Sequence, residues 1–103
     1  MTYTEGVDFE WDPNKDQANQ QKHGLSFGEA TELFTSDHDY LEIYDEGHSD
    51  KEDRFIAIGA IRVGVVVVAF TEVQEDVIRI VSARKATKKE VGLLYQYLGG
   101  ING

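Results

Sequence analysis

The feature that most restricts the fold of this chain is an uninterrupted apolar run at residues 65–70, Val-Val-Val-Val-Ala-Phe. A run of this length and composition is typical of a strand that is covered on both faces. Short turn-like segments flank it at residues 62–64 and 72–76. Strands are predicted beyond these turns at residues 54–60 and 77–84. The sequence therefore predicts an antiparallel meander with the apolar run in the middle.

Two helices are predicted in the N-terminal part of the chain. The first covers residues 13–23, because an Asp-Pro pair suits its start and Gly24 suits its end. This helix is almost wholly polar, with Ala18 as its only clear core contact, so we expect it to be peripheral. The second begins at a capping box formed by Ser26 and Glu29.

A third helix is predicted at the other end of the chain. Thr87 and Glu90 form a capping box that suits its start. Apolar side chains then recur at helical spacing over residues 91–98, and the pair of glycines at residues 99–100 should end the helix.

Two shorter strands, at residues 9–11 and 40–44, complete the expected elements. Together they predict an α+β fold that forms one domain over residues 1–103. We expect a single antiparallel β-sheet with two N-terminal helices and a C-terminal helix, packed mainly on one side of the sheet.

The charge of the chain is distributed unevenly. The net charge is -9, but residues 1–53 hold 15 acidic and 3 basic residues, whereas residues 54–103 hold 4 and 7. The first part therefore carries -12 and the second +3. An acidic total argues against binding to nucleic acid, because phosphate recognition depends on Lys and Arg. The asymmetry leaves room for a basic face within the second part.

Composition also excludes several kinds of site. The chain has no cysteine, which rules out disulfides, thiolate zinc sites and cysteine nucleophiles. It has no apolar run of membrane length and no basic leader followed by an apolar segment, so we expect no membrane association and a cytoplasmic protein. The spacing typical of metal sites, such as His-x-x-x-His, is also missing, and we expect no metal and no cofactor.

A cluster of cations follows the last predicted strand. If Ile78 and Ile80 face the core, alternation places Arg79 on the opposite, less covered face of the sheet. Four further cations gather within six residues at the junction with the last helix: Arg84, Lys85, Lys88 and Lys89.

Short motifs along the chain combine into a pattern that covers residues 9–95. They are Phe-Glu-Trp-Asp at 9–12, Lys-His-Gly at 22–24, Ser-Phe at 26–27, Glu-Ala at 29–30, His-Ser at 48–49, Glu-x-Arg-Phe at 52–55, Ile-Gly at 58–59, Thr-Glu at 71–72, Ile-Arg-Ile at 78–80 and Ser-Ala-Arg-x-Ala at 82–86, with Glu90 and Tyr95 beyond. In this order and spacing they resemble the BrnT family of toxins from bacterial type II toxin–antitoxin systems.

The resemblance implies a RelE-like α+β fold and a metal-independent endoribonuclease that inhibits translation. It also implies a BrnA-like antitoxin with a ribbon–helix–helix DNA-binding unit, which covers and neutralises the toxin. The toxin would meet DNA only through this complex, which represses its own operon.

Two features depart from the family pattern. Val73 follows the Thr-Glu pair, where family members often have arginine, and the chain is acidic overall. These departures motivate an alternative function, a catalytically degenerate binding module that retains antitoxin binding and acts in operon regulation. The acidic first half could equally face a basic antitoxin.

Metal-free RNA cleavage needs a base, an acid and cations that stabilise charge on the phosphate. The candidate cations are Arg79, Arg84 and Lys85, and the guanidinium fork suits phosphate best. The candidate proton carriers are His48, which matches the family and is a residue type that often serves in acid–base catalysis, and Glu72 at the end of a strand.

Three further cations are candidates for holding RNA: Arg54, Lys88 and Lys89. Each candidate also has a structural explanation. Arg54 could pair with Glu52 or Asp53 instead, and Arg79 could form a cross-strand ion pair.

Overall fold

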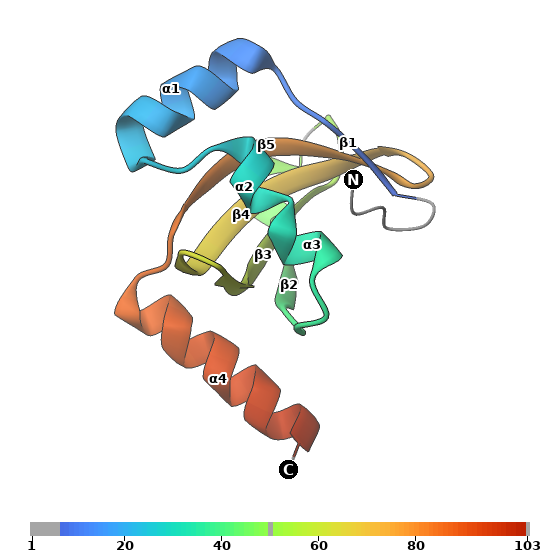
Figure 1. Ribbon diagram of the computed structural model, residues 1–103. Coiled ribbons are helices and arrows are strands. Elements are labelled where there is room, and N and C mark those ends of the chain that lie inside the picture. The colour runs from blue at the N-terminus through green and yellow to red at the C-terminus, as the bar shows by residue number, and fades with distance from the viewer. Residues whose placement is uncertain (1–6, 50, 103) are drawn as a thin grey trace.

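The computed structural model describes residues 7–49 and 51–102 and contains one five-stranded sheet (Figure 1). The strand order is β1-β5-β4-β3-β2. The strands are β1 (Asp8–Glu10), β2 (Leu41–Tyr44), β3 (Arg54–Ile61), β4 (Gly64–Gln74) and β5 (Val77–Lys85). The predicted meander of β3, β4 and β5 is confirmed, with the apolar run in the central strand β4.

The sheet is mixed, so the prediction of a purely antiparallel sheet was wrong. β1 pairs with β5 in parallel, with Asp8 opposite Val77 and Glu10 opposite Arg79. Short turns dictate the direction of neighbouring strands. β1 is joined to β5 only through the rest of the fold, so no local pattern determines its direction.

Helices cover both faces of the sheet. Helix α1 (Pro13–His23) lies along β5, and the short helices α2 (Phe27–Ala30) and α3 (Glu32–Thr35) cross one face (Figure 1). Helix α4 (Lys88–Asn102) leaves the end of β5 and packs on the opposite face, so the expectation of helices mainly on one side holds only for the first three. A 3-10 turn, η1 (Glu46–His48), lies between β2 and β3.

The N-terminal helix signals are confirmed in detail. The Asp12 side chain accepts a hydrogen bond from the Asn14 amide at 2.8 Å, and Gly24 ends α1 with φ +68°. The Ser26–Glu29 capping box is formed in both directions. The expected second helix is divided at Thr31 into α2 and α3.

The last helix does not end where the sequence suggests. It continues through Gly99 and Gly100 to Asn102. Neither glycine takes the positive φ that terminates a helix, and glycine inside a helix costs only about 1 kcal/mol relative to alanine. None of the helices in the described part of the chain combines the length and apolar character needed to cross a bilayer.

The larger hydrophobic core lies between the sheet and α2–α3. Phe27, Leu33, Val68 and Phe70 are at most 1% exposed there. A smaller cluster lies on the opposite face, where Leu94 of α4 packs with Ile58 and Val67. Each such side chain stabilises the fold by about 1.5–3 kcal/mol on burial. The alternating valines of β4 thus serve both cores, as the apolar run predicts.

A buried asparagine attaches α1 to the sheet. Asn19 is 8% exposed and donates through Nδ2 to the carbonyls of Leu25 (2.8 Å) and Ala83 (2.7 Å). Its Oδ1 accepts from the Ala83 amide at 3.2 Å. β1 pairs only with the first residues of β5, so Asn19 satisfies backbone groups on the edge that β1 leaves unpaired. The predicted contact, Ala18, is exposed.

A bulge in β5 changes which face its side chains occupy. Phe70 pairs with Ile80 but Ala69 pairs with Ser82, which leaves Val81 without a partner in β4. Simple alternation would place Arg84 on the same face as Ile80. The extra residue reverses the second half of the strand, so Arg79 and Arg84 share one face.

The part of the α4 side of the sheet that α4 leaves uncovered is called the open face below. Neighbouring positions in β3, β4 and β5 form it, as the strand pairing shows. Its residues are Arg54, Ala69, Thr71, Arg79 and Ser82, with Arg84 at the border with α4.

Candidate active site

Two arginines flank a threonine on the open face. Thr71 of β4 lies opposite Arg54 of β3 on one side and opposite Arg79 of β5 on the other. Adjacent strands are about 4.8 Å apart, so the two arginine backbones are separated by about 10 Å. Long side chains can span that gap, and both guanidinium groups can therefore reach one ligand above Thr71.

Arg54, Thr71 and Arg79 form a row across β3, β4 and β5, called the site row below. Two polar atoms in this row have no partner among the described residues. The Thr71 side chain is fully buried, yet its Oγ1 makes no hydrogen bond, and neither does the buried Nε of Arg54. Buried polar groups in proteins are almost always paired, and each unpaired one costs about 1–3 kcal/mol. Two such atoms on facing residues suit a ligand that brings several oxygens, such as phosphate.

Carboxylates hold the second arginine of the row. Arg79 donates to Glu10 Oε2 from Nε (3.0 Å) and Nη2 (2.9 Å), and its Nη1 lies 4.0 Å from Glu52 Oε1. The cross-strand ion pair expected as the structural explanation of Arg79 is therefore present. These side chains are 44–53% exposed, and exposed pairs contribute only about 0–1 kcal/mol. A phosphate group could displace them at little cost.

A pocket of about 280 Å³ adjoins the row beside η1. Its lining includes His48, Lys51, Glu52 and Arg54. The His48 Nδ1 lies 3.0 Å from Oδ2 of Asp45, and the other ring nitrogen, Nε2, takes no part in this contact. An acid–base side chain, two cations and a carboxylate thus line one depression. Neither Glu52 nor Asp53 forms an ion pair with Arg54 in the described structure.

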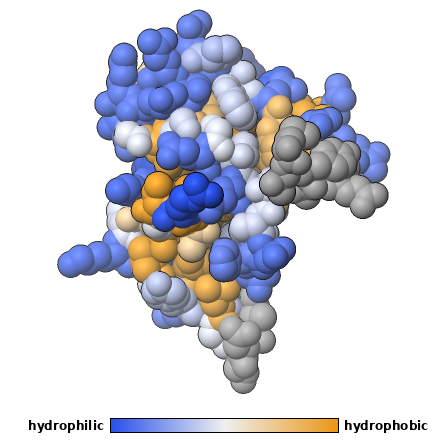
Figure 2. All heavy atoms as spheres, in the orientation of Figure 1, coloured by the Kyte–Doolittle hydropathy of each residue, from blue (hydrophilic) through white to orange (hydrophobic). Residues whose placement is uncertain are grey.

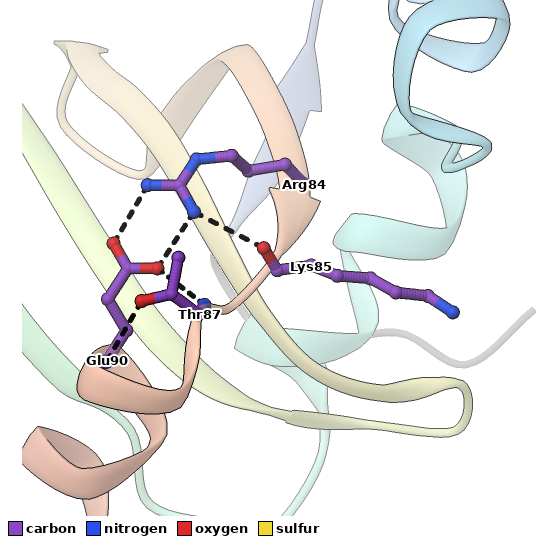
Figure 3. A network of polar contacts seen from close by, with 4 residues as sticks. All are labelled: Arg84, Lys85, Thr87 and Glu90. Carbon is purple, nitrogen blue, oxygen red and sulfur yellow. Dashed lines mark hydrogen bonds and ion pairs between the residues drawn. The ribbon is translucent and has the colours of Figure 1, made fainter.

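Arg84 is occupied by a different contact (Figure 3). Its Nη1 and Nη2 donate to the two oxygens of Glu90, each at 2.8 Å. Glu90 also accepts from the Thr87 amide at 2.8 Å, which confirms the capping box at the start of α4. The hydrogen bond from Arg84 is the main cause that lowers the pKa of Glu90 to about 2. The same contact is the main cause that raises the pKa of Arg84. The pair ties β5 to α4.

Two predicted residues lie on the other face of the sheet. Lys85 pairs with Val66 and points away from Arg84 (Figure 3). Glu72 belongs to β4, which extends to Gln74, and not to the predicted turn. Burial is the largest cause that raises the pKa of Tyr40 on the α2–α3 side, and the negative charges of Glu42 and then Glu72 add to it.

The structure therefore brings together only part of the predicted set. His48, Arg54 and Arg79 converge, whereas Glu72 and Lys85 lie elsewhere. Lys88 and Lys89 are exposed on the first turn of α4. No group of three or more potential metal ligands occurs among the described residues.

Sequence reasoning missed Thr71, Lys51 and the site role of Glu52. Thr71 could have been found by counting. The tight turn places Ile61 opposite Gly64, and stepping back along both strands from that pair brings Arg54 opposite Thr71. No local signal marks Lys51 and Glu52, because their place depends on how the loop folds back over the open face.

Comparisons with known proteins agree with this architecture. The family model described as "Ribonuclease toxin, BrnT, of type II toxin-antitoxin system" matches residues 11–90. The crystal structure of the Brucella abortus ribonuclease toxin BrnT is similar, with a TM-score of 0.60 and 26% identity, over 80% of this chain and 99% of that chain. A comparison with curated proteins found no match.

The α+β fold, the family model and the structural match define the class as ribonuclease toxins. Because the family model covers most of its length, the chain belongs to the BrnT family of type II toxin–antitoxin systems. Membership in such a system implies an antitoxin as partner.

Proposed function

We propose that this protein is a metal-independent endoribonuclease that inhibits translation by cleaving RNA on its open face. One observation carries the proposal. Arg54 and Arg79 flank Thr71, and the Thr71 Oγ1 and the Arg54 Nε are buried without a partner in the described structure. A phosphodiester placed there would supply the missing hydrogen-bond acceptors and receive two guanidinium forks.

The proposed reaction is attack of a ribose 2′-oxygen on the adjacent phosphorus, followed by loss of the 5′-oxygen. A base takes the 2′-hydroxyl proton and an acid gives a proton to the leaving oxygen. We assign these two roles to His48 and Glu52, because both line the pocket beside Arg54. Arg54 and Arg79 stabilise the negative charge that builds up on the phosphate oxygens.

The other predicted cations receive supporting roles in this proposal. Arg84 anchors α4 through Glu90 and borders the open face, so its removal would act on the fold as well as on RNA. Lys88 and Lys89, exposed at the same end of the sheet, would contact RNA outside the cleaved bond. Lys85 and Glu72 project from the opposite face and are the weakest members of the predicted set.

The test is cleavage of RNA by the purified protein in excess EDTA. Arg79→Gln should lower the cleavage rate by at least about 100-fold, the loss expected when one charge-stabilising donor is removed from an active site. Arg62→Gln is the matched control, because it removes the same charge at the exposed β3–β4 turn. Unchanged cleavage by Arg79→Gln, with a melting temperature like that of the wild type, would contradict the site.

A second candidate is a binding module that has lost cleavage. It is favoured by the half-buried Val73 at the position where the family pattern often has arginine, and by the pairing of Arg79 with Glu10. Expression without an antitoxin separates the two functions. Growth arrest that is relieved by the antitoxin supports the enzyme. Normal growth, together with intact RNA in the cleavage assay, supports the binding module.

We further propose that the antitoxin is BrnA-like and carries a ribbon–helix–helix unit, through which the toxin–antitoxin complex binds DNA. The acidic first half would face a basic partner. Leu93, Tyr95 and Tyr97 of α4 are 39–62% exposed, and Figure 2 shows apolar side chains gathered around α4 while α1 is hydrophilic. Burial of this surface by the antitoxin should protect α4 amides from hydrogen exchange, and unchanged exchange in the complex would contradict it.

Two broader assignments accompany this function. We propose that residues 1–103 act as a single toxin domain, because strands from both ends of the chain share one sheet. We also propose a cytoplasmic location, where an enzyme that stops translation meets its RNA substrate.

A further inference from the structure

A second basic depression lies between α1 and β5, away from the pocket beside η1. It has a volume of about 240 Å³, and its lining includes Lys15, Lys22, His23, Val81 and Ser82. Neither the predicted site nor the proposed cleavage chemistry uses it. It is called the α1–β5 groove below.

The face of α1 that lines the groove is held toward β5. Lys15, Asn19 and Lys22 are spaced at i, i+4 and i+7, so they lie on one side of the helix. Asn19, in the middle, is bonded to both backbone groups of Ala83. The two lysines on either side of it must therefore flank β5 as well.

The groove collects positive charge in the acidic part of the chain. Lys15 and Lys22 are two of the three basic residues in residues 1–53. The two acidic side chains at the start of α1 are engaged with backbone amides, because Asp12 accepts from Asn14 and Asp16 accepts from Phe27, each at 2.8 Å. Within the described structure neither lysine forms an ion pair with a carboxylate.

The β5 bulge connects the groove to the open face. Because Val81 is the extra residue, Ser82 turns to the side that carries Arg79 and Arg84. Ser82 lies opposite Ala69, two residues from Thr71 along β4, which is a distance of about 7 Å. Its hydroxyl makes no hydrogen bond to another described residue. A strand of RNA on the open face can therefore continue past Ser82 into the groove.

We propose that the α1–β5 groove binds backbone phosphates of single-stranded RNA next to the phosphodiester that lies at Arg54 and Arg79. This inference rests on the proposed function and extends it to a second subsite. Lys15 and Lys22 contribute compact charges to phosphate, and the Ser82 hydroxyl donates to a phosphate oxygen. The contact is with the backbone, so it adds affinity without reading sequence.

Binding of an uncleavable RNA tests the groove separately from catalysis. The probe is a fluorescent 2′-O-methyl RNA of about 12 nucleotides, a length that a small single-strand-binding site can engage. The variant is Lys15→Gln with Lys22→Gln, since glutamine keeps helix propensity while removing charge. Arg62→Gln is again the charge control. Anisotropy titrations at several salt concentrations give the dissociation constant and its salt dependence.

The double variant should weaken binding about tenfold at low salt. The slope of log affinity against log salt should also decrease by about 1.4, because each lost phosphate contact on a single strand contributes about 0.7. Arg62→Gln should change neither quantity. Equal binding by the double variant and the wild type would overturn the proposal that the groove binds RNA. The same conclusion would follow if a polyglutamate peptide displaced the labelled RNA as well as an unlabelled RNA of equal charge does.

The outcomes separate this inference from the proposed cleavage. Loss of binding in Arg79→Gln but not in the lysine double variant rejects the groove and leaves the cleavage site intact. Weaker binding in the double variant, together with a wild-type protein that cleaves no RNA, supports the groove and rejects the enzyme. A wild-type protein that binds no RNA rejects both.

Discussion

Replacing Asn19 by alanine should destabilise the protein far more than its place in a polar, peripheral helix suggests. The change removes three hydrogen bonds, at 2.7, 2.8 and 3.2 Å, from a side chain that is 8% exposed. It also leaves backbone groups of Leu25 and Ala83 unpaired in a nearly dry position. The bonds contribute about 1 kcal/mol each, and each unpaired group costs about 1–3 kcal/mol unless water reaches it.

Partial entry of water reduces this total, and we expect a loss of about 3 kcal/mol. For a chain of this size the melting temperature should fall by roughly 12–24 °C. The measurement is urea unfolding followed by circular dichroism, with the m-value checked for constancy. Asn14→Ala is the matched control, because Asn14 is exposed on the same helix and only its backbone amide is bonded.

The comparison of Asn19→Ala with Asn14→Ala tests whether the Asn19 side chain holds α1 on β5. If Asn19→Ala and Asn14→Ala lie within about 0.5 kcal/mol of each other, the side chain does not hold α1 on β5. The α1–β5 groove would then lose its structural basis, because Lys15 and Lys22 are positioned through Asn19. A large loss for Asn19→Ala alone supports both the attachment and the groove.

Two further predictions concern stability. The pKa of Glu90 is depressed from its ordinary 4.5 to about 2, so the stabilisation from its pair with Arg84 is present above pH 4.5 and is lost as the pH falls toward 2. Because Arg84 is 39% exposed, solvent screening limits this stabilisation to about 1 kcal/mol. Glu90→Gln should remove this pH dependence from unfolding curves measured between pH 6 and pH 3. A Cβ at Gly59 would lie 2.7 Å from Cβ of Tyr40, so Gly59→Ala should lower the free energy of unfolding in urea by about 1–3 kcal/mol. Gly92→Ala is the control: its Cβ would meet nothing within 4 Å, so this change should be neutral or stabilising. Equal effects of the two changes would refute the close approach at Gly59.

Local interactions account for most of what could be read from the sequence. The caps at Ser26 and Thr87 depend on side chains three residues apart, and both were predicted correctly. The apolar run of β4 and its short turns were sufficient for the meander and for the class of fold. The motif order led to the family. Within the site, the opposite placement of Arg79 and the core residue Ile80 followed from alternation alone.

Tertiary structure decided the rest, because it depended on pairings between distant segments or on irregularities that no residue pattern marks. The parallel attachment of β1 joins the two ends of the chain, and the bulge at Val81 places Arg84 on the same face as Arg79. The site row needs β3, β4 and β5 in register around Thr71. The sequence by itself thus determined the elements and the family. Burial of whole sheet faces determined which cations lie together on the open face.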